Sequence, residues 1–277
     1  MTRSVLVAGS GVSATPGAVE SLVELAHRTR TGVFNTFCAK GLFRFDDPAH
    51  FGTIGLQRDD LLLARLAEPD GARVVATGVE ADEIPGGIPG HWERFDPRAL
   101  ADLDLPEKPA FGDRPPLYAA LAAVCGPLYT LTSTPLSPVR AAGDLAAALH
   151  ADIVVTANAG LAAFWLGRTF PTRQSGSVRL PVRATHDVVA EVVASTAAVV
   201  VVCGPGDNVP DVVGAEGTVV VEHWSPTGPL LDPGQRMAAV ENALSMGGVH
   251  HLEIGVDVDD VAGLVEVAGP VTAWGLA

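Results

Sequence analysis

The stretch VLVAGSGVSA at residues 5–14 decides the fold class of this chain. It begins as a short run of aliphatic and β-branched residues and then breaks into glycines. Residues 16–28 follow, with apolar side chains at helical spacing. A strand, a tight turn and a helix in this order form the opening unit of an open α/β sheet. We therefore predict a mainly parallel sheet covered by helices on both faces.

The glycines of this stretch also fit the dinucleotide-binding spacing G-x-G-x-x-[G/A], which Ala14 completes. In that motif the glycines let the backbone approach a phosphate at the N-terminus of the next helix. A nicotinamide site also needs an acidic residue at the end of the second strand, but the strand predicted at 32–36 ends without one. Two interpretations remain: a purely structural turn, or a site for an adenine nucleotide (ADP or FAD) at Gly9, Ser10 and Gly11.

The composition limits the classes of function. Of the 277 residues, 48% are hydrophobic and 18% are charged, as in a folded protein with a large core. The net charge of -14 argues against a nucleic-acid partner. Cys38, Cys125 and Cys203 are odd in number and widely spaced, which favours buried thiols in a reducing compartment. Apolar runs are too short to cross a membrane and no signal peptide precedes the first strand, so we expect a cytoplasmic protein.

Strands and helices alternate along the rest of the chain. In the first half we predict a strand at 73–78, a helix at 60–66 that Asp59 or Asp60 caps, and a Pro- and Gly-rich loop at 85–115 anchored by Trp92 and Phe95. After a helix at 114–123, the second half is predicted to contain strands at 152–160, 198–202, 218–222 and 251–255, helices at 139–149, 187–194 and 233–245, and a short helix from Val258 that Asp257 caps. The predicted architecture is α/β, with two Rossmann-like three-layer domains at 1–134 and 135–277.

Four blocks of sequence in the first half resemble a known family. They are AGSG (8–11), NTF with AKG (35–41), HFGTIGLQ (50–57) and VATGV (75–79). In this order they resemble the central domain of the thiamine-diphosphate-dependent enzymes related to acetolactate synthase and 2-oxo acid decarboxylases. The resemblance implies a Rossmann-like sheet that holds FAD or ADP in some members and nothing in others. In the family it lies between a pyrimidine-binding domain and a diphosphate-binding domain.

The second half resembles a degenerate diphosphate-binding domain. The family binds Mg²⁺ and diphosphate through a Gly-Asp-Gly and an Asn-Asn pair, because Mg²⁺ takes oxygen ligands. Here CGPGDN (203–208) and EHW (222–224) stand at the matching places, so we expect the site for thiamine diphosphate and Mg²⁺ to be degraded. The remaining candidate metal ligands are Asp207, Asn208 and Glu222, and the alternative is that Asp207 and Asn208 only complete a turn. The candidate cofactor-binding residues of this half are Asn158, Gly204, Gly206, Asn208 and His223.

A second possible metal motif is His250-His251-x-Glu253. Neighbouring side chains on a strand point to opposite faces, so these two imidazoles are not expected to converge.

The resemblance implies two alternative functions. The first is a catalytically degenerate protein that binds a partner or a nucleotide. The second is a subunit of a split 2-oxo acid decarboxylase or carboligase, completed by a separate chain with the pyrimidine-binding domain, which this sequence does not contain. Because the family's cofactor sites lie between chains, we expect a homo-oligomer or a hetero-complex. Trp165, Phe170 and Trp224 are the candidate exposed anchors of that interface.

Overall fold

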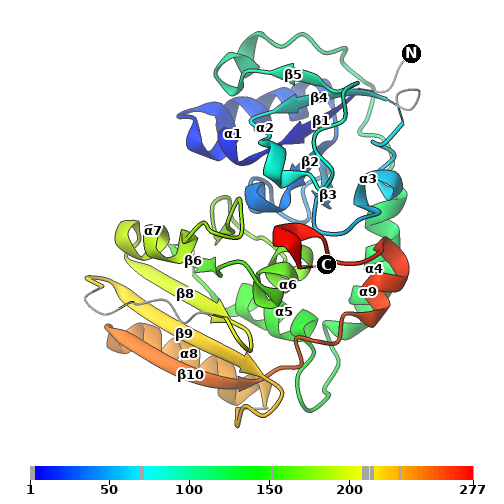
Figure 1. Ribbon diagram of the computed structural model, residues 1–277. Coiled ribbons are helices and arrows are strands. Elements are labelled where there is room, and N and C mark those ends of the chain that lie inside the picture. Colours follow the sequence, from blue (N-terminus) through cyan, green and yellow to red (C-terminus); the bar gives the residue numbers. More distant parts are fainter. Residues whose placement is uncertain are drawn as a thin grey trace. The chain divides into compact units, whose positions relative to one another are not determined.

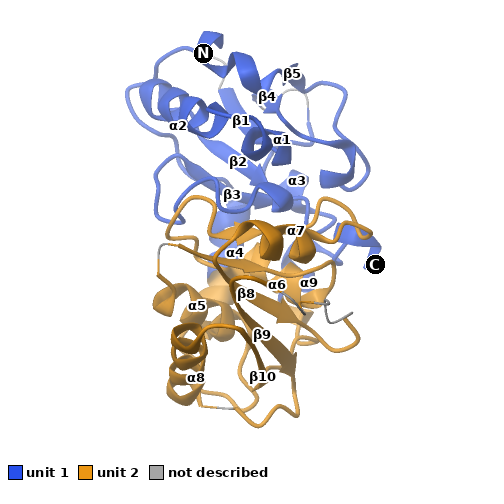
Figure 2. Cartoon of the chain, turned by 90° about the vertical axis from the view of Figure 1, so that its left-hand side faces the viewer, with its two compact units in different colours: residues 1–122, 264–277 blue, residues 123–263 orange. Residues whose placement is uncertain are grey.

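The computed structural model describes residues 4–68, 72–150, 152–207, 212, 215–230 and 232–276. The chain forms two compact units, one made of residues 1–122 and 264–277 and the other of residues 123–263 (Figure 2). Each unit is built around its own five-stranded sheet, in which the strands pair in parallel (Figure 1). The predicted α/β class with two parallel-sheet domains is therefore confirmed.

The division between the units differs from the boundary expected near residue 134. It falls inside helix α4 (Pro116–Leu128), and the C-terminal residues return to the first unit. The side-chain amide of Gln57 holds this return by donating to the carbonyl oxygens of Leu264 and Gly269, at 2.9 and 2.6 Å. These partners are 207 and 212 positions away in the sequence, so no local pattern could predict these contacts.

The first unit has the strand order β3-β2-β1-β4-β5. Its strands are β1 (Ser4–Ala8), β2 (Val33–Thr36), β3 (His50–Ile54), β4 (Arg73–Thr77) and β5 (Glu93–Phe95). Its helices are α1 (Ser10–Ala14), α2 (Ala18–Thr29), α3 (Asp60–Leu63), the start of α4 and most of α9 (Ala262–Ala268), with 3-10 helices at Phe37–Ala39, Ala81–Glu83, Pro97–Asp102 and Ala273–Gly275. Every residue of β1 is buried, as expected for the central strand of a sheet covered on both faces.

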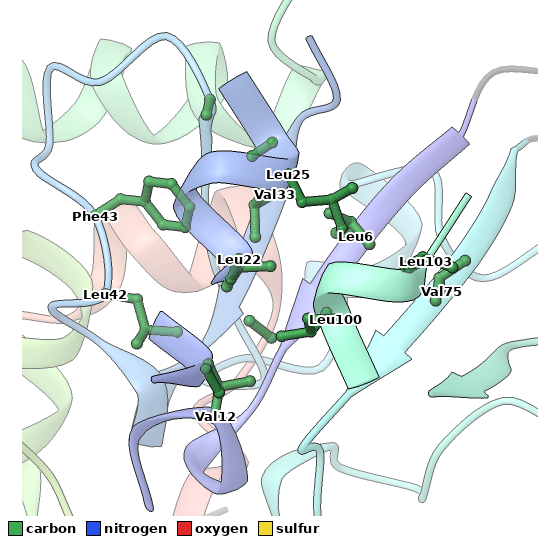
Figure 3. Close-up of a cluster of buried hydrophobic side chains, with 14 of the residues drawn as sticks. Leu6, Val12, Leu22, Leu25, Val33, Leu42, Phe43, Val75, Leu100 and Leu103 are labelled. Carbon is green, nitrogen blue, oxygen red and sulfur yellow. The ribbon is translucent and has the colours of Figure 1, made fainter. Parts of the chain in front are cut away.

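The core of the first unit lies on both faces of its sheet. On one face, Leu6 and Val75 of the sheet belong to one cluster with Leu22 and Leu25 of α2 and with Leu100 (Figure 3). Full burial of each of these side chains contributes about 1.5–3 kcal/mol. The cluster on the other face includes Val5, Val7, Phe34, Phe51, Ile54 and Trp92.

The sequence does not predict β3 and β5. The first contains Gly52, and the second has only three residues inside the Pro- and Gly-rich segment. Trp92 does anchor that segment, because it is buried and its indole N–H donates to the carbonyl oxygen of Leu66 at 3.1 Å. The helix predicted at 60–66 ends at Leu63. Instead of capping the helix, the Asp60 carboxylate accepts from the backbone N–H groups of residues 56 and 57.

The second unit has the strand order β10-β9-β8-β6-β7. Its strands are β6 (Ile153–Thr156), β7 (Val178–Arg179), β8 (Ala198–Cys203), β9 (Thr218–Ser225) and β10 (Val249–Gly255), and its helices include α5 (Pro138–Ala148), α6 (Leu161–Thr169), α7 (Val188–Ser195) and α8 (Pro233–Met246). Side chains of Ser137, Asp187 and Asp232 cap α5, α7 and α8. The predicted short helix starts at Ala262 rather than at Val258, because the Asp257 carboxylate accepts from the Asp259 N–H in a turn.

Both sheets contain a point where the order of the strands reverses. It lies between β1 and β4 in the first unit and between β6 and β8 in the second. Open α/β sheets bind ligands in the crevice outside the carboxyl ends of the strands at such a switch point. The candidate residues after β1, β6 and β8 therefore lie at the carboxyl edge of their sheets, where a ligand is expected.

Candidate functional site

In the first unit, the turn after β1 packs directly against the end of β4. A Cβ on Gly9 would lie 2.4 Å from the carbonyl oxygen of Gly78, and one on Gly11 would lie 2.9 Å from the same oxygen. The N–H groups of Gly9 and Gly11 donate to the carbonyl oxygens of Thr77 and Gly78, at 3.0 and 2.8 Å. These glycines are thus required for close packing of two backbone segments, and their N–H groups already have partners inside the chain.

The carboxylate of Glu83 lies at the N-terminus of α1. One of its oxygens accepts from the backbone N–H of Ser10 at 2.9 Å and from the Ser10 hydroxyl, and the other accepts from the Thr36 hydroxyl at 2.7 Å. Glu83 is fully buried, and this burial raises its pKa, although the hydrogen bonds from Ser10 and Thr36 act in the opposite direction. An acidic side chain does reach the end of the second strand, from a residue 47 positions after Thr36, but both of its oxygens are used by Ser10 and Thr36.

Two titratable groups near this crevice are held in their neutral forms. Burial raises the pKa of the Cys38 thiol, and the nearby Glu83 adds to the effect. Burial lowers the pKa of His50 to about 3, and its Nε2 atom forms a hydrogen bond with the Asn35 side chain at 2.9 Å. A protonated thiol and a neutral, hydrogen-bonded imidazole are structural groups rather than a nucleophile with its base.

In the second unit, the turn after β8 folds back on itself. The Asp207 carboxylate accepts from the backbone N–H of Gly204 at 2.6 Å, and Gly206 has a φ of 79°. The other oxygen of Asp207 lies 2.4 Å from the place that a Cβ on Gly160 would occupy. Gly160 is the N-cap of α6, so this carboxylate lies at a helix N-terminus, where the dipole favours a negative charge. Burial raises the pKa of Asp207, and the Gly204 hydrogen bond opposes that effect.

Asn158 lies after β6 and organises the neighbouring helix. Its side-chain N–H donates to Asp187 at 3.1 Å, and its oxygen accepts from the Val189 N–H at 3.4 Å. Asp187 in turn caps α7 by accepting from the Ala190 N–H. Asn158 therefore has a structural role at the crevice, as a partner of the α7 cap.

Glu222 does not lie free as a metal ligand, contrary to the sequence-based expectation. Both of its oxygens accept from the Arg236 guanidinium, at 2.9 and 2.6 Å, and one also accepts from the Trp224 indole N–H at 2.8 Å. The Glu222 and Arg236 side chains are both 0% exposed. Arg236 lies in α8, 14 positions after Glu222, and no local pattern indicated this pair.

The other candidate residues separate in the structure. Asn208 lies outside the described residues, and His223 pairs with His251 of the next strand. Across the parts of the chain that the structure describes, no group of three His, Cys, Asp or Glu side chains is placed to hold a metal ion. Cys203 is buried at the end of β8, and burial raises its pKa to about 12.

The three aromatic residues expected as exposed anchors are buried instead. Trp165 and Trp224 are each 1% exposed and Phe170 is 3% exposed. The Trp165 indole N–H donates to the carbonyl oxygen of Val258 at 2.8 Å, which fixes the ring inside the second unit. The expectation of an interface through these side chains is corrected: their surfaces complete the core.

No helix among the described residues is long and apolar enough to cross a membrane.

By fold, both units are doubly wound α/β sheets of the class that binds ligands at a switch point. Residues 1–112 match the family model for the thiamine pyrophosphate enzyme central domain. The solved structure of a Mycobacterium smegmatis protein assigned to the thiamin diphosphate-dependent enzymes has a similar fold, with a TM-score of 0.65 and 14% identity, covering 92% of this chain and 62% of that chain. A search of curated proteins gives no match. Residues 1–112 are therefore similar to the thiamine pyrophosphate enzyme central domain, the resemblance that the sequence blocks indicated.

Proposed function

We propose that this chain is a non-catalytic relative of the thiamine-diphosphate enzymes that acts by binding another protein chain. One observation supports this function in both units: an acidic side chain of the protein itself lies at the helix N-terminus of the crevice. Glu83 takes this place in the first unit and Asp207 in the second. A phosphate would compete with Glu83 for the Ser10 N–H and with Asp207 for the Gly204 N–H, and each carboxylate would repel it, so both crevices favour the closed arrangement.

The described residues do not fit a magnesium diphosphate. Mg²⁺ requires a near-octahedral shell of oxygen atoms, usually from one or two carboxylates together with phosphates and water. Asp207 is the single described carboxylate among the candidates that could supply an oxygen, because Glu222 is neutralised by Arg236. The Asp207 side chain also fills the space beside Gly160 that a phosphate at α6 would need. No catalytic step is therefore assigned to thiamine diphosphate in this chain.

The occupied N–H groups of the first crevice likewise favour a protein partner over an adenine nucleotide. In the first unit, the N–H groups of Gly9 and Gly11 are bonded to the end of β4, and the Ser10 N–H is bonded to Glu83. A nucleotide phosphate would have to displace a buried carboxylate to reach them. A thermal-shift panel of ADP, FAD, CoA and NAD is expected to show no stabilisation.

Calorimetric titration of the full chain with thiamine diphosphate and Mg²⁺ tests the proposal. We expect no magnesium-dependent heat for the wild type. Replacement Asp207→Gly removes the internal anion, so inorganic pyrophosphate should bind this variant at least tenfold more tightly than it binds the wild type. The control is Asp232→Gly, which uncaps α8 at a solvent-exposed helix terminus and should bring no comparable gain.

The alternative function predicts the opposite effect for loss of the Asp207 carboxylate. If the chain were a subunit of a split decarboxylase or carboligase, Asp207 would bind Mg²⁺, as the acid of the family's Gly-Asp-Gly does. The wild type would then show a magnesium-dependent isotherm, and Asp207→Asn would weaken it. That result would refute the non-catalytic proposal and favour the alternative.

Exposed apolar side chains are the candidate contacts for the partner. Leu62 on α3 is 61% exposed and Met246 at the end of α8 is 60% exposed. If the partner is a second copy, sedimentation velocity will show an oligomer that Leu62→Ser or Met246→Ser dissociates. A wild-type chain that sediments as a monomer would exclude the second copy and leave a different protein as the partner.

A further inference from the structure

A pair of histidines lies outside both crevices, on the last two strands of the second sheet. The Nε2 atom of His223 on β9 is 3.0 Å from the Nδ1 atom of His251 on β10, and the two ring planes are 17° from parallel. At this distance one nitrogen donates a hydrogen bond and the other accepts it. The two rings therefore bring two nitrogen atoms into direct contact with each other.

The register of the strands explains why these rings meet. His223 is aligned with Glu253 on β10, and His251 precedes Glu253 by two residues, so all three side chains project from the same face of the sheet. His250 projects from the opposite face, where its Nε2 atom is bonded to the carbonyl oxygen of Gly247 at 2.7 Å. The prediction that His250 and His251 do not converge is thus correct, and the partner of His251 comes from the neighbouring strand.

The pair is accessible to solvent. β10 is the edge strand of its sheet, His251 and Glu253 are exposed, and His223 is half-buried. The Glu253 carboxylate has no hydrogen bond or ion pair with the described residues and adds negative charge beside the rings. The net charge of -14 further favours cations near this surface.

We propose that His223 and His251 form a two-histidine site for a divalent cation of the late first transition row, such as Zn²⁺ or Cu²⁺. Imidazole nitrogen is a preferred ligand of these ions. Two nitrogens that each lie about 2.1 Å from one metal are about 3.0–3.4 Å apart for angles between 90° and tetrahedral. The observed separation of 3.0 Å falls at the lower end of this range.

Metal binding requires only small changes in the pair. The proton shared between the rings moves to the other nitrogen of its own imidazole, so that both facing nitrogens offer a lone pair. The exposed His251 ring and the half-buried His223 ring then tilt toward a common point, and water completes the coordination shell. This site uses no residue of either crevice, so it is independent of the proposed function.

Calorimetry with Zn²⁺ and electron paramagnetic resonance with Cu²⁺ test the proposal on the full chain. The wild type should bind one equivalent that His223→Gln and His251→Gln each weaken at least tenfold. The matched control is His250→Gln, one residue away on the opposite face, which should bind as the wild type does. The Cu²⁺ spectrum should show coupling to two imidazole nitrogens in the wild type and in the control.

Two results would overturn the proposal. One is that His223→Gln and His251→Gln leave the Zn²⁺ affinity of the wild type unchanged, or that the wild type binds no Zn²⁺. The other is that the His250→Gln control loses as much affinity as these two variants. Circular dichroism of each variant shows whether it folds, and the Cu²⁺ spectrum of the wild type needs no variant. Coupling to a single nitrogen in the wild type would therefore also refute a two-histidine site.

Discussion

Removing the charge of Arg236 should be among the most destabilising single changes in the second unit. Its guanidinium donates to both oxygens of Glu222 and to the carbonyl oxygen of Ala141, and none of the Arg236 or Glu222 side chain reaches solvent. In Arg236→Met the Glu222 carboxylate remains buried and, among the described residues, keeps the Trp224 N–H as its one donor. Loss of one partner from a buried ion pair costs about 3–5 kcal/mol.

The double variant Arg236→Met with Glu222→Leu distinguishes the cost of an unpaired buried charge from the cost of altered packing. Replacing both charges by apolar groups of similar size is often neutral, so much of the lost stability should return. The Trp224 N–H still loses its acceptor, so about 1–3 kcal/mol of destabilisation should remain for that buried group. The Ala141 oxygen keeps its helical hydrogen bond because it lies inside α5. The surface control is Arg140→Met, since the Arg140–Asp144 pair is about one-fifth exposed and is worth at most about 1 kcal/mol.

Denaturant unfolding followed by tryptophan fluorescence measures these changes, because Trp165 and Trp224 are both buried in this unit. At about 2–4 °C per kcal/mol, Arg236→Met should lower Tm by roughly 6–20 °C. An effect no larger than that of Arg140→Met would refute the reasoning. It would also restore Glu222 as a free carboxylate and thus as a metal ligand.

Two further predictions concern the first crevice. Gly78 has a φ of 59°, and a Cβ there would lie 2.5 Å from the Val12 nitrogen, so Gly78→Ala should lower the free energy of unfolding by about 2–4 kcal/mol in thermal unfolding. The control Gly86→Ala, where φ is also positive but the surrounding space is open, should lower it by about 1 kcal/mol. Equal costs for the two variants would contradict the packing argument. Because folding raises the pKa of Glu83, its stabilising effect is complete below its ordinary value of 4.5 and is lost as the pH rises through the folded-state pKa. Glu83→Gln should therefore gain stability relative to the wild type as the pH rises from 4.5, and a constant difference across that range would show that Glu83 does not titrate in this way.

The sequence was sufficient for the parts of the fold that depend on local pattern. β1 and β8 contain apolar runs of four and six residues, and such runs are typical of buried parallel strands whatever their partners are. The caps Asp187 and Asp232 each precede a helix and accept from the residue three positions later, which is also a local signal. The weak strands β5 and β7 have only three and two residues, and pairing with a stronger neighbour decides their conformation.

The candidate sites depended on contacts that the sequence does not encode locally. Glu83 reaches Ser10 across 73 positions, and Glu222 meets Arg236 only because α8 returns to the face of β9. In the amino-acid sequence, a glutamate near the end of a strand has the same pattern whether its carboxylate is free or paired with an arginine. His223 and His251 likewise meet through the register of two strands, which follows from the whole sheet.

The return of residues 264–276 to the first unit makes that unit depend on residues that are synthesised after the second unit. Chains usually fold domain by domain from the N-terminus as they are made. Here the buried amide of Gln57 and the carbonyl oxygen of Leu56 acquire their partners only after residues 123–263 have been translated. Trp274, which packs against Phe37 with ring centroids 4.9 Å apart, arrives later still. A ribosome-bound chain that has been translated only to residue 263 would therefore hold an unfinished, protease-sensitive first unit until residues 264–276 emerge.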